Sequence, residues 1–166
     1  MKGSDAFWSV TGDLAENLQG VHVRPKEVEV VTEGARLQEM LGRLSEYRPT
    51  EPAPTERRLE RDAEIEGKSP PVVSKSVSAG LTVEGVPVPI HGDYRLKVGE
   101  WELGDAVVFD PIVMNVAGVP LPVMPLRIAS EIYLTLGWVD RVEKISDAVA
   151  RAHHALHQQS GGEPVY

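Results

Sequence analysis

The chain has 166 residues, a length that suits one domain able to bury about two-thirds of its unfolded surface. Its 17 basic and 25 acidic residues give a net charge of −8, which makes nucleic acid an unlikely main partner because phosphate binding requires clustered Lys and Arg. The absence of cysteine excludes disulfides and thiol chemistry, and no apolar run reaches membrane-spanning length, so we expect a cytoplasmic protein with no membrane partner.

The first half of the chain is predicted to alternate short helices with one strand. Residues 12–20 have the apolar spacing of a two-turn helix, and residues 27–32, EVEVVT, have the composition of a strand. Thr32 can cap the helix that follows. The apolar stripe of that helix consists of Leu37, Met40, Leu41 and Leu44. Residues 48–71 have prolines at both ends and many charges between them, which predicts a long loop or a short exposed helix.

The second half is rich in short strands and ends in two helices. Strands are predicted over residues 72–83, 86–92, 93–98, 105–116 and 119–124. A helix beginning after Pro125 is followed by one over residues 139–159. The apolar stripe of the last helix consists of Val142, Ile145, Val149, Ala152 and Leu156. We therefore expect a single domain over residues 1–158 and a flexible tail over residues 159–166.

Prolines in two of the strands indicate how the sheet is arranged. Residues i and i+2 of a strand direct their N–H groups to the same edge, so Pro87 and Pro89 leave one edge without donors. Pro120 and Pro122 do the same in their strand, and strands of this kind are normally edge strands or bulged strands. We therefore predict an α+β fold, with an open mixed β-sheet, helices packed on it and two C-terminal helices that close it.

Two carboxylates stand one residue apart in a run of valines, at Glu27 and Glu29. Buried carboxylates are costly unless something binds them, which favours metal ligands projecting from one face of a strand. Alternation alone favours a different interpretation, in which Val28 and Val30 face the core and both glutamates face solvent. The residues by themselves leave both interpretations open.

The segment over residues 11–32, TGDLAENLQGVHVRPKEVEVVT, resembles the signature of minimal nucleotidyltransferases of the DNA polymerase β type. In that family a Gly-Ser pair opens a short helix, and a strand bearing Asp-x-Asp follows. Gly12 matches the glycine, Gly20 the end of the helix, and Glu27 and Glu29 the acidic pair. Residues 81–93, 118–126 and 133–145 are similar in element order to archaeal and bacterial members related to abortive-infection toxins.

The resemblance implies a metal-dependent transfer of a nucleoside monophosphate from a nucleoside triphosphate to a protein or a small molecule. Two Mg²⁺ or Mn²⁺ ions, about 4 Å apart, carry this chemistry. Glu27 and Glu29 would be the catalytic residues and the metal ligands, and Gly12 and Asp13 would bind the nucleotide. The paired toxin systems also imply a helical partner protein.

The sequence departs from the family pattern at each chemical position. Glutamates replace both aspartates and shift the ligand oxygens by about 1 Å, against a geometry that Mg²⁺ holds tightly. Asp13 replaces the serine and carries the same sign of charge as a triphosphate. The family's third carboxylate aligns with Pro89, and the nearest acids are Glu84 and Asp93.

These departures predict a degenerate nucleotidyltransferase-like protein with weak or no transfer. One alternative is a Mn²⁺ site rebuilt from the two glutamates with Asp13 or Asp93. Another is a non-enzymatic α+β binding module whose acidic pair is only a strand surface.

Three further polar features allow a functional and a structural interpretation. Asp13 can be an ordinary helix N-cap, which would explain why it replaces a serine. His91 can be a catalytic base or a structural histidine beside a glycine turn. His153, His154 and His157 can hold a metal ion, or interact favourably with the C-terminal end of a helix dipole.

Overall fold

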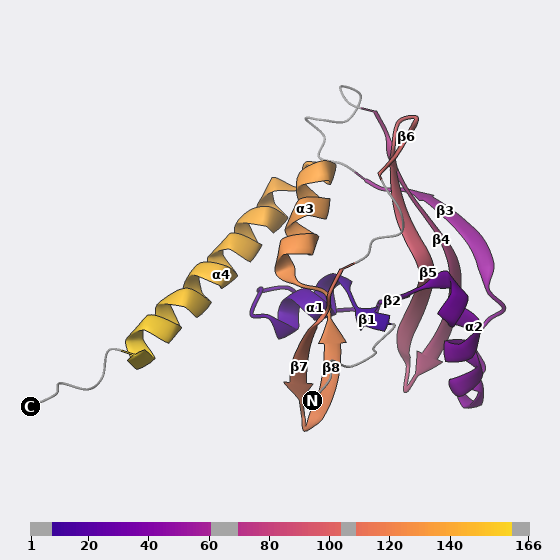
Figure 1. The fold of residues 1–166 in the computed structure, drawn as a ribbon, viewed down its shortest axis with the longest axis horizontal. Helices are drawn as coiled ribbons and strands as arrows, with labels where there is room; N and C mark the ends of the chain where they lie inside the picture. The colour runs from indigo at the N-terminus through magenta and orange to yellow at the C-terminus, as the bar shows by residue number, and fades with distance from the viewer. Residues whose placement is uncertain (1–7, 61–69, 104–108, 161–166) are drawn as a thin grey trace, which may run out of the picture.

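The structure is a computed structural model that describes residues 8–60, 70–103 and 109–160. Figure 1 shows helices on both sides of a twisted sheet, with the last helix projecting away from the body. Along the chain the elements are β1 (Trp8–Val10), α1 (Gly12–Leu18), β2 (Val30–Thr32), α2 (Gly34–Arg43), a 3₁₀ turn (Ser45–Tyr47), β3 (Ala53–Arg58), β4 (Val72–Val83), β5 (Val86–Val98), β6 (Trp101–Leu103), β7 (Ile112–Val116), β8 (Val119–Val123), α3 (Leu126–Leu136) and α4 (Val139–Ser160).

The sheet is open and mixed, as the sequence predicts. Its strand order is β3-β4-β5-β2-β1-β8-β7, and β6 pairs with β5 outside this order. The pairs β2–β5 and β1–β8 are parallel, whereas the other pairs are antiparallel. The prediction of an α+β fold closed by two C-terminal helices is therefore confirmed.

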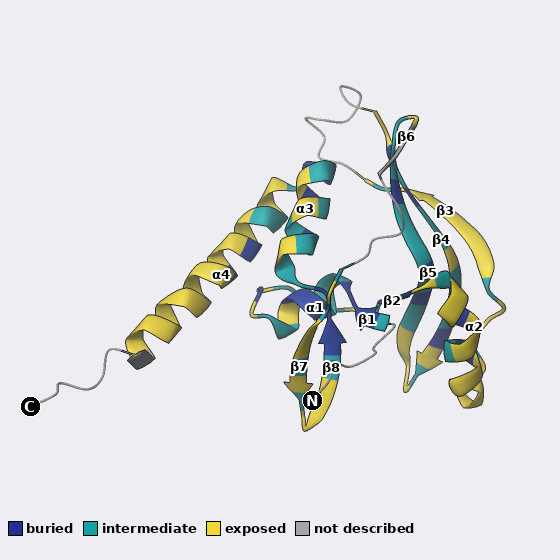
Figure 2. Ribbon diagram, viewed as in Figure 1, coloured by how far each residue is buried: buried dark blue, intermediate teal, exposed yellow. Residues whose placement is uncertain are grey.

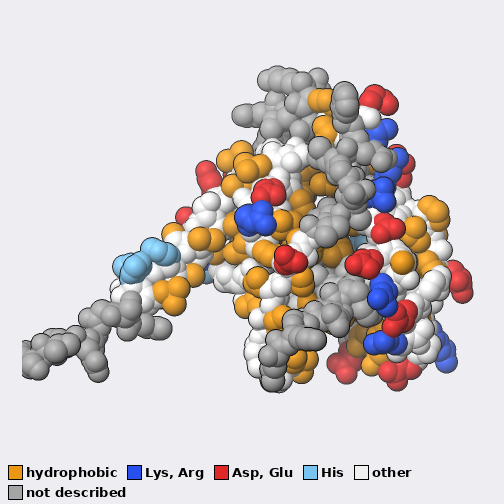
Figure 3. All heavy atoms as spheres, viewed as in Figure 1, with side chains coloured by type: hydrophobic (Ala, Val, Ile, Leu, Met, Phe, Trp, Pro, Cys, Tyr) orange, Lys and Arg blue, Asp and Glu red, His pale blue; other side chains and the backbone are white. Residues whose placement is uncertain are grey.

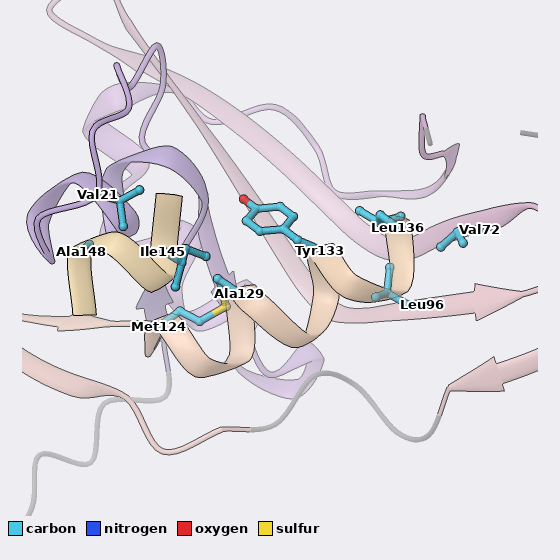
Figure 4. Packing of buried hydrophobic residues seen from close by; sticks show 9 residues of the cluster. All are labelled: Val21, Val72, Leu96, Met124, Ala129, Tyr133, Leu136, Ile145 and Ala148. Carbon is cyan, nitrogen blue, oxygen red and sulfur yellow. The ribbon is translucent and has the colours of Figure 1, made fainter. Parts of the chain in front are cut away.

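Apolar side chains form two main clusters on the sheet. Leu37 and Leu41 of α2 pack against Ile90 of β5 and its neighbours, as the predicted stripe requires. A second cluster, shown in Figure 4, joins α3 and the first turns of α4 to β4 and β5. Its buried members are Val21, Val72, Leu96, Met124, Ala129, Tyr133, Leu136, Ile145 and Ala148.

The apolar stripe of α4 is buried only in its first half. Ile145 and Ala148 are buried, whereas Val149 and Leu156 are 52% and 66% exposed. Figure 2 shows the projecting half of α4 as exposed, and Figure 3 shows histidines gathered near its far end. α4 extends to Ser160, two residues into the predicted tail, and residues 161–166 lie outside the described part of the chain.

The two proline-containing strands were predicted to be edge strands or bulged strands, and the first alternative is wrong because both lie inside the sheet order. The second agrees with β5, where the register with β4 shifts between Lys75 and Val77 as in a β-bulge. β5 pairs with β4 over most of its length, but with β2 only at Ile90–Gly92, beyond the prolines. The carbonyl oxygen of Pro87 instead accepts a hydrogen bond from the N–H of Val28 (3.0 Å). β8 likewise meets β1 only at Val123. The prolines therefore limit the length of the parallel ladders rather than ending the sheet.

Three other local predictions need correction. The 48–71 segment contains strand β3, which pairs with β4, in place of a loop or a helix, although residues 61–69 lie outside the described part. β5 is one strand where two were predicted. Thr32 ends β2, and the N-cap of α2 is Glu33 rather than Thr32; the N–H of Gly34 donates to the carboxylate of Asp93 (2.8 Å).

No helix in the described ranges is both long and apolar enough to cross a bilayer.

Candidate functional site

The four residues that the resemblance singled out lie around one cleft of about 480 Å³. Gly12 and Asp13 border it from the start of α1, and Glu27 and Glu29 border it from the segment that leads into β2. Lys26 and the β3 side chain Arg57 add two positive charges. The apolar and aromatic part of the lining includes Leu59, Tyr94, Ile132, Leu136 and Trp138. The cleft therefore combines charged groups with an apolar wall supplied largely by α3.

Neither glutamate lies within a strand, because β2 begins only at Val30. The N–H of Thr11 donates to the carbonyl oxygen of Glu29 (2.9 Å), which holds the turn before α1 beside this segment. Glu27 is exposed, whereas the side chain of Glu29 is 30% exposed. Backbone hydrogen bonds of the segment before β2 therefore place Glu27 and Glu29, and Glu29 is the more buried of the two.

Gly12 and Glu29 are in direct contact. Gly12 has a φ of +63°, and a Cβ added to it would lie 2.5 Å from Oε2 of Glu29. Glycine is required here both for its left-handed backbone and for the space that the carboxylate occupies. Glu29 is therefore not simply a solvent-facing strand residue, and the interpretation of the pair as plain surface fails for it.

The surroundings of Glu29 disfavour its charge. Burial raises the pKa of Glu29 and the nearby charge of Glu27 raises it further, while a hydrogen bond with Thr11 acts in the opposite direction. Nε2 of His91 lies 3.5 Å from Oε1 of Glu29. Burial, followed by the positive charge of Arg57, lowers the pKa of His91, so its imidazole is neutral at pH 7.

Asp13 is paired with an arginine from α4. Nη2 of Arg141 lies 2.5 Å from Oδ1 of Asp13 and 2.9 Å from Oε2 of Glu16. The N-cap of α1 is Thr11, so the interpretation of Asp13 as the N-cap is wrong. An Asp13 carboxylate that is neutralised in this way is not placed as an independent ligand.

Arg141 also forms an ion pair with a buried carboxylate, that of Glu16. Glu16 is fully buried, and its Oε1 accepts a short hydrogen bond from the hydroxyl of Tyr133 on α3. Burial raises the pKa of Glu16, and the contacts with Tyr133 and Arg141 oppose that shift. Figure 4 shows Tyr133 among the buried residues of the second apolar cluster. Arg141 thus links α4 to α1 through two carboxylates.

The side chains present do not fit a two-metal centre. Asp13 is neutralised by Arg141, and the β5 side chain that reaches Glu29 is His91 rather than a carboxylate. Asp93 binds the N-terminus of α2, and Pro89 offers no ligand. Within residues 8–60, 70–103 and 109–160, no three His, Asp or Glu side chains are grouped to hold a metal ion. This includes the histidines of α4, where Nε2 atoms of His153 and His157 lie 3.2 Å apart.

Sequence reasoning missed Arg141, Glu16 and Tyr133. Glu16 gave one local signal, since it follows Asp13 by three residues on a short helix and would share its side. Arg141 gave no local signal, because it lies 125 residues from Glu16 in the sequence.

Comparison with known proteins bears on the fold. No protein-family model matches the chain, and no curated protein does. Among solved structures, the chain is similar to the crystal structure of a "putative nucleotidyltransferase" from Thermotoga maritima. The two share 23% identity with a TM-score of 0.59, and the match covers 91% of this chain and 86% of that one. The likeness shows a nucleotidyltransferase-like fold.

Proposed function

We propose that this chain is a nucleotidyltransferase-like protein that binds a nucleoside triphosphate in the 480 Å³ cleft but transfers the nucleoside monophosphate weakly or not at all. The volume is within the usual range for small-molecule sites, roughly 300–1,000 Å³. Tyr94 and Trp138 offer aromatic surface to a base, and Lys26 and Arg57 offer positive charge to phosphates.

The pairing of Arg141 with Asp13 carries the proposal of weak transfer. It holds Asp13, which stands at the family's serine position, in an ion pair, so this residue offers neither a hydroxyl to a triphosphate nor a free carboxylate to a metal ion. The loss of about 3 kcal/mol of transition-state stabilisation already slows a reaction by a factor of about 150.

Calorimetry with a nucleoside triphosphate, combined with a label-transfer assay in Mg²⁺ or Mn²⁺, tests both parts. We expect binding that is lost in Arg57→Ala and kept in the control Arg36→Ala, whose side chain lies on α2 away from the cleft. We expect label transfer near background in every variant. Robust transfer that disappears in Glu27→Gln would contradict the loss of activity, and an absence of nucleotide binding would contradict the ligand.

The proposal includes a helical partner protein, which the likeness to paired toxin systems implies. The exposed apolar half of α4 supports it, together with a groove of about 770 Å³ between α3 and α4. If a helical protein binds there, Val149→Glu should abolish its association, because Val149 lines the groove and is exposed, whereas Glu143→Gln on α4 should not. Association unchanged by Val149→Glu would place any partner elsewhere.

A further inference from the structure

The imidazole of His91 lies between the hydroxyl of Ser78 and the carboxylate of Glu29, the residue that precedes β2. Oγ of Ser78 on β4 lies 2.8 Å from Nδ1 of His91 on β5. The other ring nitrogen, Nε2, lies 3.5 Å from Oε1 of Glu29. Ser78 and His91 are direct partners in the β4–β5 register, so the first contact is set by rigid strands. The order of hydroxyl, imidazole and carboxylate is that of an activated nucleophile.

We propose that Ser78, His91 and Glu29 form a nucleophilic site that cleaves small carboxylic esters. Ser78 Oγ would attack the carbonyl carbon and form an ester bond as the bond to the departing alcohol breaks. The proton of Ser78 passes to Nδ1 of His91 and then to the departing oxygen. Water releases the acyl group by the reverse sequence and restores the serine. This site does not depend on nucleotide binding.

The electrostatics of the three side chains suit this order. In the tautomer that carries the ring proton on Nε2, on the side of Glu29, Nδ1 is free to accept a hydrogen bond from Ser78, and this is the tautomer that the proposal requires. Burial lowers the pKa of His91, so the ring is a free base at neutral pH. Ser76 Oγ, 2.7 Å from Ser78 Oγ, supplies a further hydrogen-bond partner to the nucleophile.

The 480 Å³ cleft borders this site at Glu29, whereas the residues that line the cleft do not include Ser78 or His91. Its lining includes Val31, the register partner of His91, and Tyr94, whose ring centroid is 5.9 Å from that of His91. Ser78 itself is half-buried. Arg57 lines the same cleft, and its charge acts on both His91 and Glu29.

A fluorophosphonate probe and p-nitrophenyl acetate test the proposal on the full chain. The probe reacts by forming a bond from Ser78 Oγ to phosphorus with loss of fluoride, and mass spectrometry locates the modified residue. We expect the label on Ser78, an initial burst of nitrophenolate, and loss of both in Ser78→Ala. His91→Gln should slow labelling by about 100-fold, the usual contribution of a general base. The control Ser146→Ala, exposed on α4, should react as the unaltered chain does.

The pH dependence of labelling in the unaltered chain provides a second test that needs no variant. The rate should fall as the pH is lowered through the pKa of His91, which lies below 6.5. The charged and titratable groups that face His91 are Glu29 before β2, Arg57 on β3 and Tyr94 on β5. Labelling of Ser76 or another residue instead of Ser78 would overturn the proposal. An unchanged rate in a folded His91→Gln variant would do the same.

Discussion

The side chain of Glu29 occupies the space that a Cβ at residue 12 would need. Gly12→Ala should therefore lower the free energy of unfolding through both the left-handed φ, which costs about 1–2 kcal/mol, and displacement of Glu29. Gly20→Ala is the matched control, because φ is +88° there and no atom lies within 4 Å of the added Cβ. Urea denaturation should show the larger loss for Gly12→Ala. In a Glu29→Ala background the two losses should become similar, and a persistent difference would rule out the contact as its cause.

The pKa of Glu29 predicts a pH dependence of stability. Because its folded pKa is raised above 4.5, its stabilising contribution is fully present below pH 4.5 and is lost as the pH rises through the folded value. Glu29→Gln removes this titration. We expect the melting temperature of the unaltered chain to fall, relative to Glu29→Gln, between pH 4.5 and pH 7. The exposed control Glu46→Gln should run parallel to the unaltered chain, and a parallel profile for Glu29→Gln would contradict the assignment.

Among the elements, α1 and α4 depend on each other through Arg141. Arg141→Ala leaves Glu16 buried without its cation, a change that typically costs about 3–5 kcal/mol. Arg151→Ala is the matched control: Arg151 also joins α4 to the α1 region, by donating to the carbonyl of Gly20 (2.9 Å), but it is exposed. Its removal should cost about 1 kcal/mol or less. Equal urea midpoints for the two variants would mean that the buried network contributes little. Glu16→Gln combined with Arg141→Ala should restore part of the loss.

α2 depends on Asp93 at its N-terminus. Asp93→Ala removes the acceptor of the Gly34 N–H and should lower the free energy of unfolding by about 1 kcal/mol. Asp93→Asn keeps an oxygen acceptor and tolerates the φ of +50° at this residue, so it should retain most of the stability. Thermal melting of both variants checks this, and equal losses would show that backbone strain, rather than the hydrogen bond, dominates.

The elements that the sequence predicts well are those with local determinants. β4 has the predicted bounds, and α3 begins after Pro125 and ends before Gly137, because alternation, proline and glycine act within a few residues. β2 is shorter than predicted because its length depends on Pro87 and on the backbone of Thr11, which are distant in sequence. β3 was missed because its charged residues lie at an exposed sheet edge, where no apolar alternation is needed.

The same distinction applies to the candidate site. Gly12, Asp13, Glu27 and Glu29 stand within one motif, and the structure places them around one cleft. The partner of Asp13 comes from α4, 128 residues later, and no local pattern could identify it. His91 was considered as a base, but its contact with Ser78 depends on the β4–β5 register. The catalytic and ligand-binding roles of all these residues stay predictions.

At the scale of the whole molecule, the projecting half of α4 should be less stable than the buried elements that the structure describes. Residues 149–158 are exposed, and an isolated helix of that length is marginal in water. In hydrogen exchange, amides of residues 149–158 should exchange faster than those around Ile145 and Ala148, which are buried. Amides near Ile90 serve as the slow reference, since that side chain is fully buried. Uniform protection along α4 would indicate that another molecule covers it.

The link between Glu16 and Arg141 also fixes the order in which the protein can mature on the ribosome. The residue that neutralises Glu16 is made 125 residues after it, roughly 6–25 s later at ordinary rates of synthesis. Strand β8, the parallel neighbour of β1, also comes late. The hairpin of β4 and β5, with α2 beside it, contains contacts that can form earlier. A nascent chain halted before Arg141 should therefore hold α1 undocked and open to protease, and the first helix to be translated is among the last to be secured.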